Sequence, residues 1–127
     1  MTREELFSYV KEEYAQEPDY PFENDFETAV LRHSDTGKWF ALAMYVRADR
    51  LGYDSDSFLS VVTVKSDPML IDTLIRQQGF HRAYHMNKLK WLTIELERVN
   101  ESEIKDLIDM SYGLTDRKLP KRYENCC

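Results

Sequence analysis

The side chains of this chain that are best suited to chemistry gather between Phe80 and Trp91, in the stretch FHRAYHMNKLKW. The stretch contains two histidines, an arginine, two lysines and an asparagine among aromatic residues, and it contains no acid. Three interpretations fit such a composition: a catalytic centre with histidine as the proton carrier, a surface that binds polyanions, or the polar side of a hairpin. The rest of the sequence has to discriminate among them.

The spacing of the histidines disfavours a metal site. His81 and His85 would point to the same face of a strand, but at roughly 3.3 Å per residue they lie about 13 Å apart. Two ligands of one zinc ion must both lie within about 2.1 Å of it. We therefore predict no metal site, and we interpret these histidines, with His33, as polar residues of a sheet face.

No motif of a known catalytic site is present. The four glycines are scattered singly, so no phosphate-binding loop is formed. No serine lies in a nucleophile elbow, and Cys126 and Cys127 are far from any histidine in the sequence. Glu95 and Glu97 alternate with apolar residues in a predicted strand and are expected to face solvent. We predict a protein without enzymatic activity and without a cofactor.

Charge is distributed unevenly along the chain, which has a net charge of −6. Residues 1–27 contain nine acids and two bases, whereas residues 28–99 contain ten bases and eight acids. Residues 76–94 contain no acid and four bases, which are Arg76, Arg82, Lys88 and Lys90. The total charge argues against nucleic-acid binding, but this local cluster is what a polyanion-binding surface needs.

A helix is predicted at the N-terminus. Thr2 and Glu5 have the spacing of a capping box, in which each side chain accepts a hydrogen bond from the other residue's backbone. Apolar residues then follow at intervals of three and four, so residues 3–16 are predicted to form an amphipathic helix that ends before Pro18 and Pro21. The next segment, EPDYPFENDFE, is predicted to be an acidic loop that its aromatic residues attach to the body of the protein.

Strand patterns dominate the middle of the chain. Residues 28–47 are predicted to form a hairpin around the turn DTG, and residues 60–65 alternate as in a third strand. FHRAYHM and WLTIELE are predicted to be two further strands, joined by a short turn around NKLK. Asn87 suits such a turn because asparagine tolerates left-handed backbone angles.

Two more helices are predicted. Pro68 is in the first turn of one, where proline is tolerated, and Gly79 is placed to close it. Asn100 or Ser102 is predicted to cap the last helix, which ends near Gly113. The resulting order is α-β-β-β-α-β-β-α, with the strands in antiparallel runs and too few helices for parallel crossovers. The predicted fold class is therefore α+β.

Length and composition limit the number of domains and the class of protein. A chain of 127 residues, 43% of them hydrophobic, is expected to form one domain over residues 1–127, with residues 116–127 as an extended or disordered tail. No apolar run approaches the roughly 20 residues of a membrane span, and no signal-peptide pattern opens the chain. We expect a cytoplasmic monomer that does not bind membranes and has no disulfide framework, because its two cysteines are terminal neighbours.

The same stretches resemble the MmcQ/YjbR family. The segments that carry the resemblance are AYHMNKLKWLTIEL, SEIKDLIDMSYGLT and KLPKR, with PFENDFETAVLRHSDTGKWFALA and VTVKSDPMLIDTLIRQQGF upstream. They follow in order from Leu6 to Arg122. The resemblance implies a fold like that of the bacterial frataxin CyaY, with helices on one face of an antiparallel sheet. It also implies DNA binding, the function with which the family is usually described.

The main hypothesis is therefore DNA binding through a basic hairpin. Its candidate residues are Arg76, Arg82, Tyr84, His85, Asn87, Lys88, Lys90, Lys121 and Arg122. The alternative is a module that binds an acidic protein or a small anion, with a pocket beside Tyr84, His85 and Asn87. A weaker third hypothesis follows from frataxin, in which the acids of the first helix would bind metal ions.

A purely structural explanation of the family motif stays open beside these hypotheses. Ser111 and Tyr112 would then hydrogen-bond back to the turn at Asn87 and lock it. Trp39 and Trp91 lie in apolar strands, so they are expected to be core residues.

Overall fold

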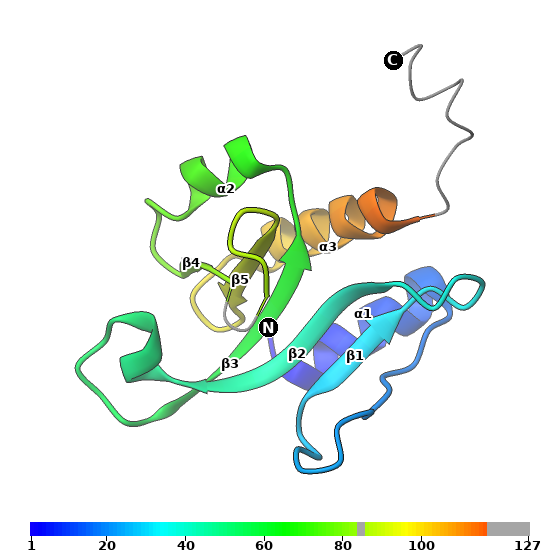
Figure 1. Ribbon diagram of the computed structural model, residues 1–127, viewed down its shortest axis with the longest axis horizontal. Coiled ribbons are helices and arrows are strands. Elements are labelled where there is room, and N and C mark those ends of the chain that lie inside the picture. The colour runs from blue at the N-terminus through cyan, green and yellow to red at the C-terminus, as the bar shows by residue number, and fades with distance from the viewer. Residues whose placement is uncertain (84–85, 117–127) are drawn as a thin grey trace.

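The computed structural model describes residues 1–83 and 86–116, which form three helices and a five-stranded sheet (Figure 1). The helices are α1 (Arg3–Tyr14), α2 (Pro68–Leu74) and α3 (Glu101–Thr115); a short 3-10 helix, η1 (Ala48–Leu51), follows β2. The strands are β1 (Ala29–Arg32), β2 (Trp39–Arg47), β3 (Phe58–Lys65), β4 (Phe80–Arg82) and β5 (Trp91–Glu95). The predicted α+β class and element order are confirmed.

All neighbouring strands are antiparallel, in the spatial order β1-β2-β3-β5-β4. Because side chains alternate between the two faces of a sheet, the register decides which residues lie side by side. One row crosses the whole sheet, from Val30 through Leu42, Thr63 and Thr93 to His81. The predicted hairpin at 28–47 and the two strands around the NKLK turn are thereby confirmed.

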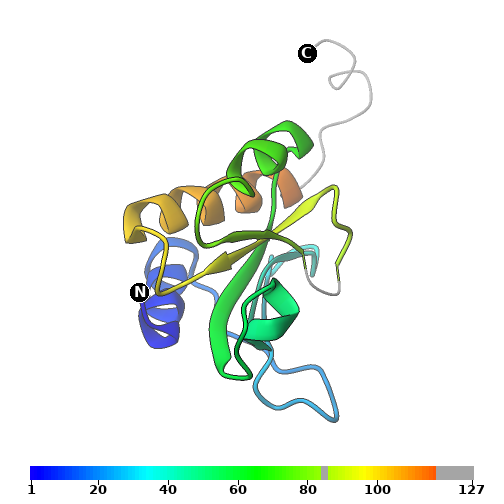
Figure 2. The same ribbon diagram turned by 90° about the vertical axis from the view of Figure 1, so that its left-hand side faces the viewer.

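One face of the sheet, here called the covered face, packs against all three helices. Its largest buried side chains include Leu31, Phe40, Leu92 and Ile94 from the strands. They meet apolar residues of the helices, namely Leu6, Val10, Ile71, Leu74, Ile104, Leu107 and Ile108. In Figure 2, α1 and α3 lie together on the left of the sheet.

The opposite face, here called the open face, has no helix longer than η1 against it among the described residues. A smaller apolar cluster lies there, formed by Val30, Leu42, Met44, Val46 and Val61. Phe22, from the acidic loop, packs against it, which confirms that an aromatic residue attaches this loop to the body. Loops therefore cover this face only in part (Figure 2).

The first helix begins as predicted but ends earlier. Thr2 and Glu5 form the capping box, with Thr2 N donating to Glu5 Oε1 at 2.8 Å and Glu5 N to Thr2 Oγ1 at 3.1 Å. The helix ends at Tyr14, because Ala15 adopts a left-handed conformation with φ 55°. The prediction that the helix extends to residue 16 and is ended by the prolines was therefore wrong by two residues.

Gly79 has a different role from the predicted one. Helix α2 ends at Leu74, well before Gly79, which has φ 92° and leads directly into β4. A Cβ atom at this position would lie 2.7 Å from Val99 Cγ2, so the close approach requires glycine. The C-cap is Ile75 rather than Gly79, and at the other end Asp67 is the N-cap, whose carboxylate accepts from the amides of Met69 and Leu70. No helix of the described residues has the length and apolar character of a membrane span.

Candidate functional site

Two of the predicted cations, Lys88 and Lys90, are exposed on the turn between β4 and β5. Asn87 organises this turn: its Oδ1 accepts from Leu89 N at 2.9 Å, and its backbone oxygen accepts from Lys90 N at 3.2 Å and from Trp91 N at 2.9 Å. The side chains of Lys88 and Lys90 are exposed. Asn87 is not among the described residues with positive φ, so the predicted left-handed angle was wrong and its side-chain acceptor explains its use here.

Two further cations of the predicted site, Arg76 and Arg82, lie on the segments that precede this turn in the sequence. Ser66 N, just before α2, donates to Lys90 O at 2.9 Å, which ties the turn to the start of the helix. Arg76 is exposed after the end of α2, and Arg82 is exposed on β4. We call the group of Arg76, Arg82, Lys88 and Lys90 the basic corner. The four residues lie within 76–90 of the sequence and come from three successive segments, the residues after α2, β4 and the turn.

The cations of the basic corner differ in their partners. Arg82 Nη2 lies 2.9 Å from Asp72 Oδ1, so part of its charge is neutralised. Arg76, Lys88 and Lys90 form no ion pair within 1–83 and 86–116. Figure 2 has the turn, in yellow-green, on the right of the molecule and α1, with its acids, on the left. The acids of α1 are therefore separated in space from the turn, whereas Glu23 and Asp25 of the acidic loop line a hollow together with Met86, which precedes the turn.

Four candidate residues of the sequence analysis lie outside the described residues, namely Tyr84, His85, Lys121 and Arg122. The same applies to the terminal pair Cys126 and Cys127. The described part of the predicted site therefore consists of the basic corner and Asn87.

The prediction that Ser111 and Tyr112 hydrogen-bond to the turn at Asn87 was wrong, because both residues have other partners. Ser111 is fully buried; its hydroxyl donates to Phe40 O at 2.6 Å and accepts from Lys65 N at 2.9 Å. It therefore ties α3 to β2 and β3 rather than to the turn. Tyr112 stacks on Tyr14 with ring centroids 3.9 Å apart, which joins α3 to α1. The reason is position: both residues lie on the helix face that packs on the sheet.

A buried charged cluster on the open face was missed. Glu95 is only 2% exposed, contrary to the prediction that it faces solvent. Its Oε2 is hydrogen-bonded to Tyr53 OH at 2.6 Å and His81 Nε2 at 2.7 Å, and its Oε1 pairs with Arg98 Nε at 3.1 Å. Burial, and next the hydrogen bond to Glu95, raise the pKa of Tyr53. The guanidinium of Arg98 also lies over the Tyr53 ring, 4.9 Å from its centroid.

A weak sequence signal pointed to this cluster. Glu95 is an acid in the middle of the run WLTIELE, and two possible partners, His81 and Arg98, lie on the neighbouring strand and just beyond β5. The third partner, Tyr53, comes from the loop after η1, and no local pattern connects it to Glu95. Both carboxylate oxygens of Glu95 have partners, as buried polar groups usually do.

The acids of the first helix form no evident metal site. Glu4, Glu5 and Glu12 line a shallow hollow with Glu101 and Lys105. Within 1–83 and 86–116, no group of three histidine, cysteine, aspartate or glutamate side chains is arranged to hold a metal ion.

The two tryptophans are less enclosed than predicted. Trp39 and Trp91 are half-buried and pack against the apolar cluster of the open face, whereas the main core lies on the covered face. The alternation of strand residues explains the difference, because both rings point away from the helices.

Comparison with known proteins decides the family. The YjbR family model matches residues 11–114 of this chain. The chain belongs to the YjbR family. The uncharacterized protein YyaQ of Bacillus subtilis (strain 168) is 40% identical over 116 residues, which cover 91% of this chain and 98% of YyaQ. The resemblance predicted from the sequence motifs is thus confirmed.

Solved structures of similar proteins share the fold. A crystal structure of a protein from Pseudomonas syringae is 38% identical, with a TM-score of 0.88, over 91% of this chain and 99% of that one. A solution NMR structure from the same organism is 36% identical, with a TM-score of 0.84, over 94% and 97% of the two chains. The Deinococcus radiodurans protein DR2400, with a DUF419 domain, is 25% identical, with a TM-score of 0.70, over 92% and 80%.

Proposed function

We propose that this YjbR-family protein binds polyanions, DNA in the first place, through the basic corner. The observation that carries the proposal is the exposure of Lys88 and Lys90 on a turn that Asn87 organises by three hydrogen bonds. Lysines held on an ordered turn contact successive phosphates at a lower entropic cost than lysines on a disordered segment.

The charge distribution supports the same proposal. Phosphate contacts by Lys and Arg dominate non-specific DNA affinity, and a net charge of −6 opposes the approach of DNA. The acids of α1 lie across the molecule from the turn (Figure 2), so a DNA backbone can contact the basic corner at a distance from most of them. With about four cations in contact, the association constant should fall by roughly 100-fold between 50 and 200 mM salt.

The test is fluorescence anisotropy with labelled double- and single-stranded oligonucleotides across a salt series. The variant Lys88→Glu/Lys90→Glu should weaken binding by at least about tenfold and flatten the salt dependence, because two phosphate contacts are lost. No binding by the wild type at low salt would contradict the proposal.

A matched control separates the basic corner from the overall charge. Lys38→Glu/Arg50→Glu changes the net charge by the same amount at two exposed residues on other segments, the β1–β2 turn and η1. This control should bind nearly as the wild type does. An equal loss in both double variants would assign the effect to total charge and would contradict a defined site.

A second candidate is an acidic protein partner or a small anion at the same corner. An acidic protein with one basic patch suits such a partner through charge complementarity. Binding of a poly-glutamate peptide, but not of DNA, with the same sensitivity to Lys88→Glu/Lys90→Glu would favour this candidate.

We also propose that the protein acts by binding alone, without catalysis. The described acid–base pair, Glu95 with His81, supports this because the carboxylate is buried and already has Tyr53, His81 and Arg98 as partners. A general base needs a free position within hydrogen-bond reach of its substrate.

A further inference from the structure

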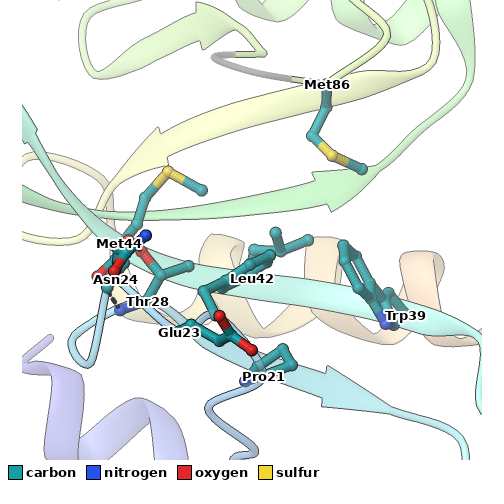
Figure 3. A pocket seen from close by; sticks show the side chains of 10 residues that line it. Pro21, Glu23, Asn24, Thr28, Trp39, Leu42, Met44 and Met86 are labelled. Atoms are coloured by element: carbon teal, nitrogen blue, oxygen red, sulfur yellow. Dashed lines mark hydrogen bonds between the residues drawn. The ribbon is translucent and has the colours of Figure 1, made fainter.

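The open face contains a hollow that the basic corner does not use. Its volume is about 770 Å³, within the range of roughly 300–1,000 Å³ that small-molecule sites occupy. Trp39, Leu42 and Met44 of β2 line one side, and Met86, from the segment before β5, lies across from them (Figure 3). Residues 21–25 of the acidic loop line the rest.

The fold explains why this hollow exists. Alternation along β2 directs Leu42 and Met44 to the open face, where no long helix covers them. Phe22 and Trp39 meet edge to face, with ring centroids 6.0 Å apart and planes at 84°, and both rings are half-buried. Met86 is half-buried as well. Leu42 and Met44 are already buried, so a ligand in the hollow would mainly bury apolar surface of Phe22, Trp39 and Met86.

The charge of the hollow is negative. Of its lining residues in the described part of the chain, the charged ones are Glu23 and Asp25, and both are acids. Glu23 is exposed and forms no ion pair or hydrogen bond within 1–83 and 86–116. Asp25 accepts hydrogen bonds from the Thr28 hydroxyl and from the amides of Thr28 and Glu27, at 3.0 and 3.1 Å for the amides.

These hydrogen bonds also keep Asp25 ionised. The Thr28 hydroxyl, and next the Thr28 amide, hold the pKa of the Asp25 carboxyl below its usual value. At neutral pH the hollow thus combines aromatic rings, flexible methionines and two carboxylates. Aromatic ring faces and carboxylates attract organic ammonium groups, whereas a carboxylate ligand would meet like charge.

We propose that this hollow binds a small organic ammonium compound. The alkyl or aromatic body of the ligand lies on Leu42, Met44 and Met86, and its ammonium group lies between Glu23 and the ring of Trp39. Methionine suits such a site because its flexible side chain adapts to ligands of different shape. The site uses other residues and the opposite charge from the basic corner, so it does not depend on the proposed polyanion binding.

The test uses octyltrimethylammonium as the probe, with octanoate as a matched anion of the same chain length. Methionine methyl groups labelled with ¹³C report the site by NMR: Met44 and Met86 line the hollow, and Met69, which is 79% exposed on α2, reports non-specific contact. Saturable shifts of Met44 and Met86 are expected, with roughly fivefold tighter binding of the cation than of octanoate.

Charge variants then locate the ammonium group. Glu23→Lys should weaken octyltrimethylammonium binding by roughly tenfold and strengthen octanoate binding. Glu13→Lys makes the same charge change at an exposed position on α1 and should change neither. Equal affinity for the two probes, shifts confined to Met69, or equal effects of the two variants would each overturn the proposal.

Discussion

The two faces of the sheet differ in what packs on them, and therefore in the interactions that their residues form. On the covered face, Leu92 and Ile94 are fully buried against three helices in a continuous apolar core. On the open face, the same strand β5 contributes Thr93 and Glu95, which are hydrogen-bonded to Thr63 and to the Tyr53–His81–Arg98 cluster. Neighbouring residues of one strand thus serve apolar packing on one side and a polar network on the other.

In this protein, room for binding lies on the side of the sheet that long helices do not cover. Helices that close one face supply most of its stability, because burial of apolar surface is the dominant favourable contribution to folding. Loops close the other face incompletely and leave the hollow beside Trp39 and the exposed turn at Lys88. The hollow lies where no long helix packs on the sheet, whereas Arg82 of the basic corner pairs with Asp72 of α2.

The largest expected effect compares one residue type on the two faces. Leu92→Ala should lower the free energy of unfolding by about 4 kcal/mol, because it removes apolar contacts and leaves an enclosed cavity. Leu42→Ala should lower it by about 2 kcal/mol, because the lost volume merges with a hollow that already exists. Urea unfolding measures both values. A larger loss for Leu42→Ala would reverse the assigned roles of the faces.

The next largest effect on stability is expected at the buried carboxylate of Glu95 on the open face. Glu95→Ala should lower the free energy of unfolding by about 3 kcal/mol, because it leaves His81 and Arg98 without their buried partner. Glu97, two residues further on, is exposed, so Glu97→Ala should stay within about 0.5 kcal/mol of the wild type. Similar values for the two variants would show that the cluster contributes no net stability.

A smaller effect is expected at the polar contact between α3 and the sheet. Ser111→Ala should lower the free energy of unfolding by about 2 kcal/mol, since Lys65 N and Phe40 O lose their shared hydroxyl. Ser8→Ala, at an exposed position of α1, is the matched control and should change stability by less than about 0.5 kcal/mol. An equally small change at Ser111 would mean that water replaces the hydroxyl.

The smallest effect is a dependence on alkaline pH. The raised pKa of Tyr53 means that the folded protein keeps this proton after the unfolded chain, with a tyrosine pKa of about 10, has lost it. Its contribution to stability is therefore complete below about pH 10 and is lost as the pH rises through the folded-state pKa. Tyr53→Phe should make the free energy of unfolding decline less steeply above about pH 10, as urea unfolding at several pH values would measure. Identical slopes for variant and wild type would refute this role.

Local patterns predicted much of the fold correctly. The capping box at Thr2, the DTG hairpin and the capping asparagine at Asn100 are contacts between near neighbours, and each formed as expected. Boundaries were less reliable: α2 ends before Gly79, because the glycine is needed for close approach to Val99 rather than as a helix cap.

For the candidate residues, the sequence predicted exposure better than it predicted contacts. Lys88 and Lys90 are exposed on a turn as the basic hairpin requires, yet Ser111 binds the sheet rather than that turn. The error has a physical cause. Packing decides which face of a helix meets the sheet, and the distance along the chain between the helix and a turn does not.

The sequence by itself determined the family, the α+β class, the order of the elements and the asymmetry of charge, because short-range periodicity, capping and composition act within a few residues. The tertiary structure alone decided that Glu95 is enclosed by Tyr53, His81 and Arg98, and that Trp39 and Met86 share a hollow. These arrangements join segments that are up to 47 residues apart, for Trp39 and Met86. Strand register and loop packing bring such segments together, and no local pattern encodes which of them will meet.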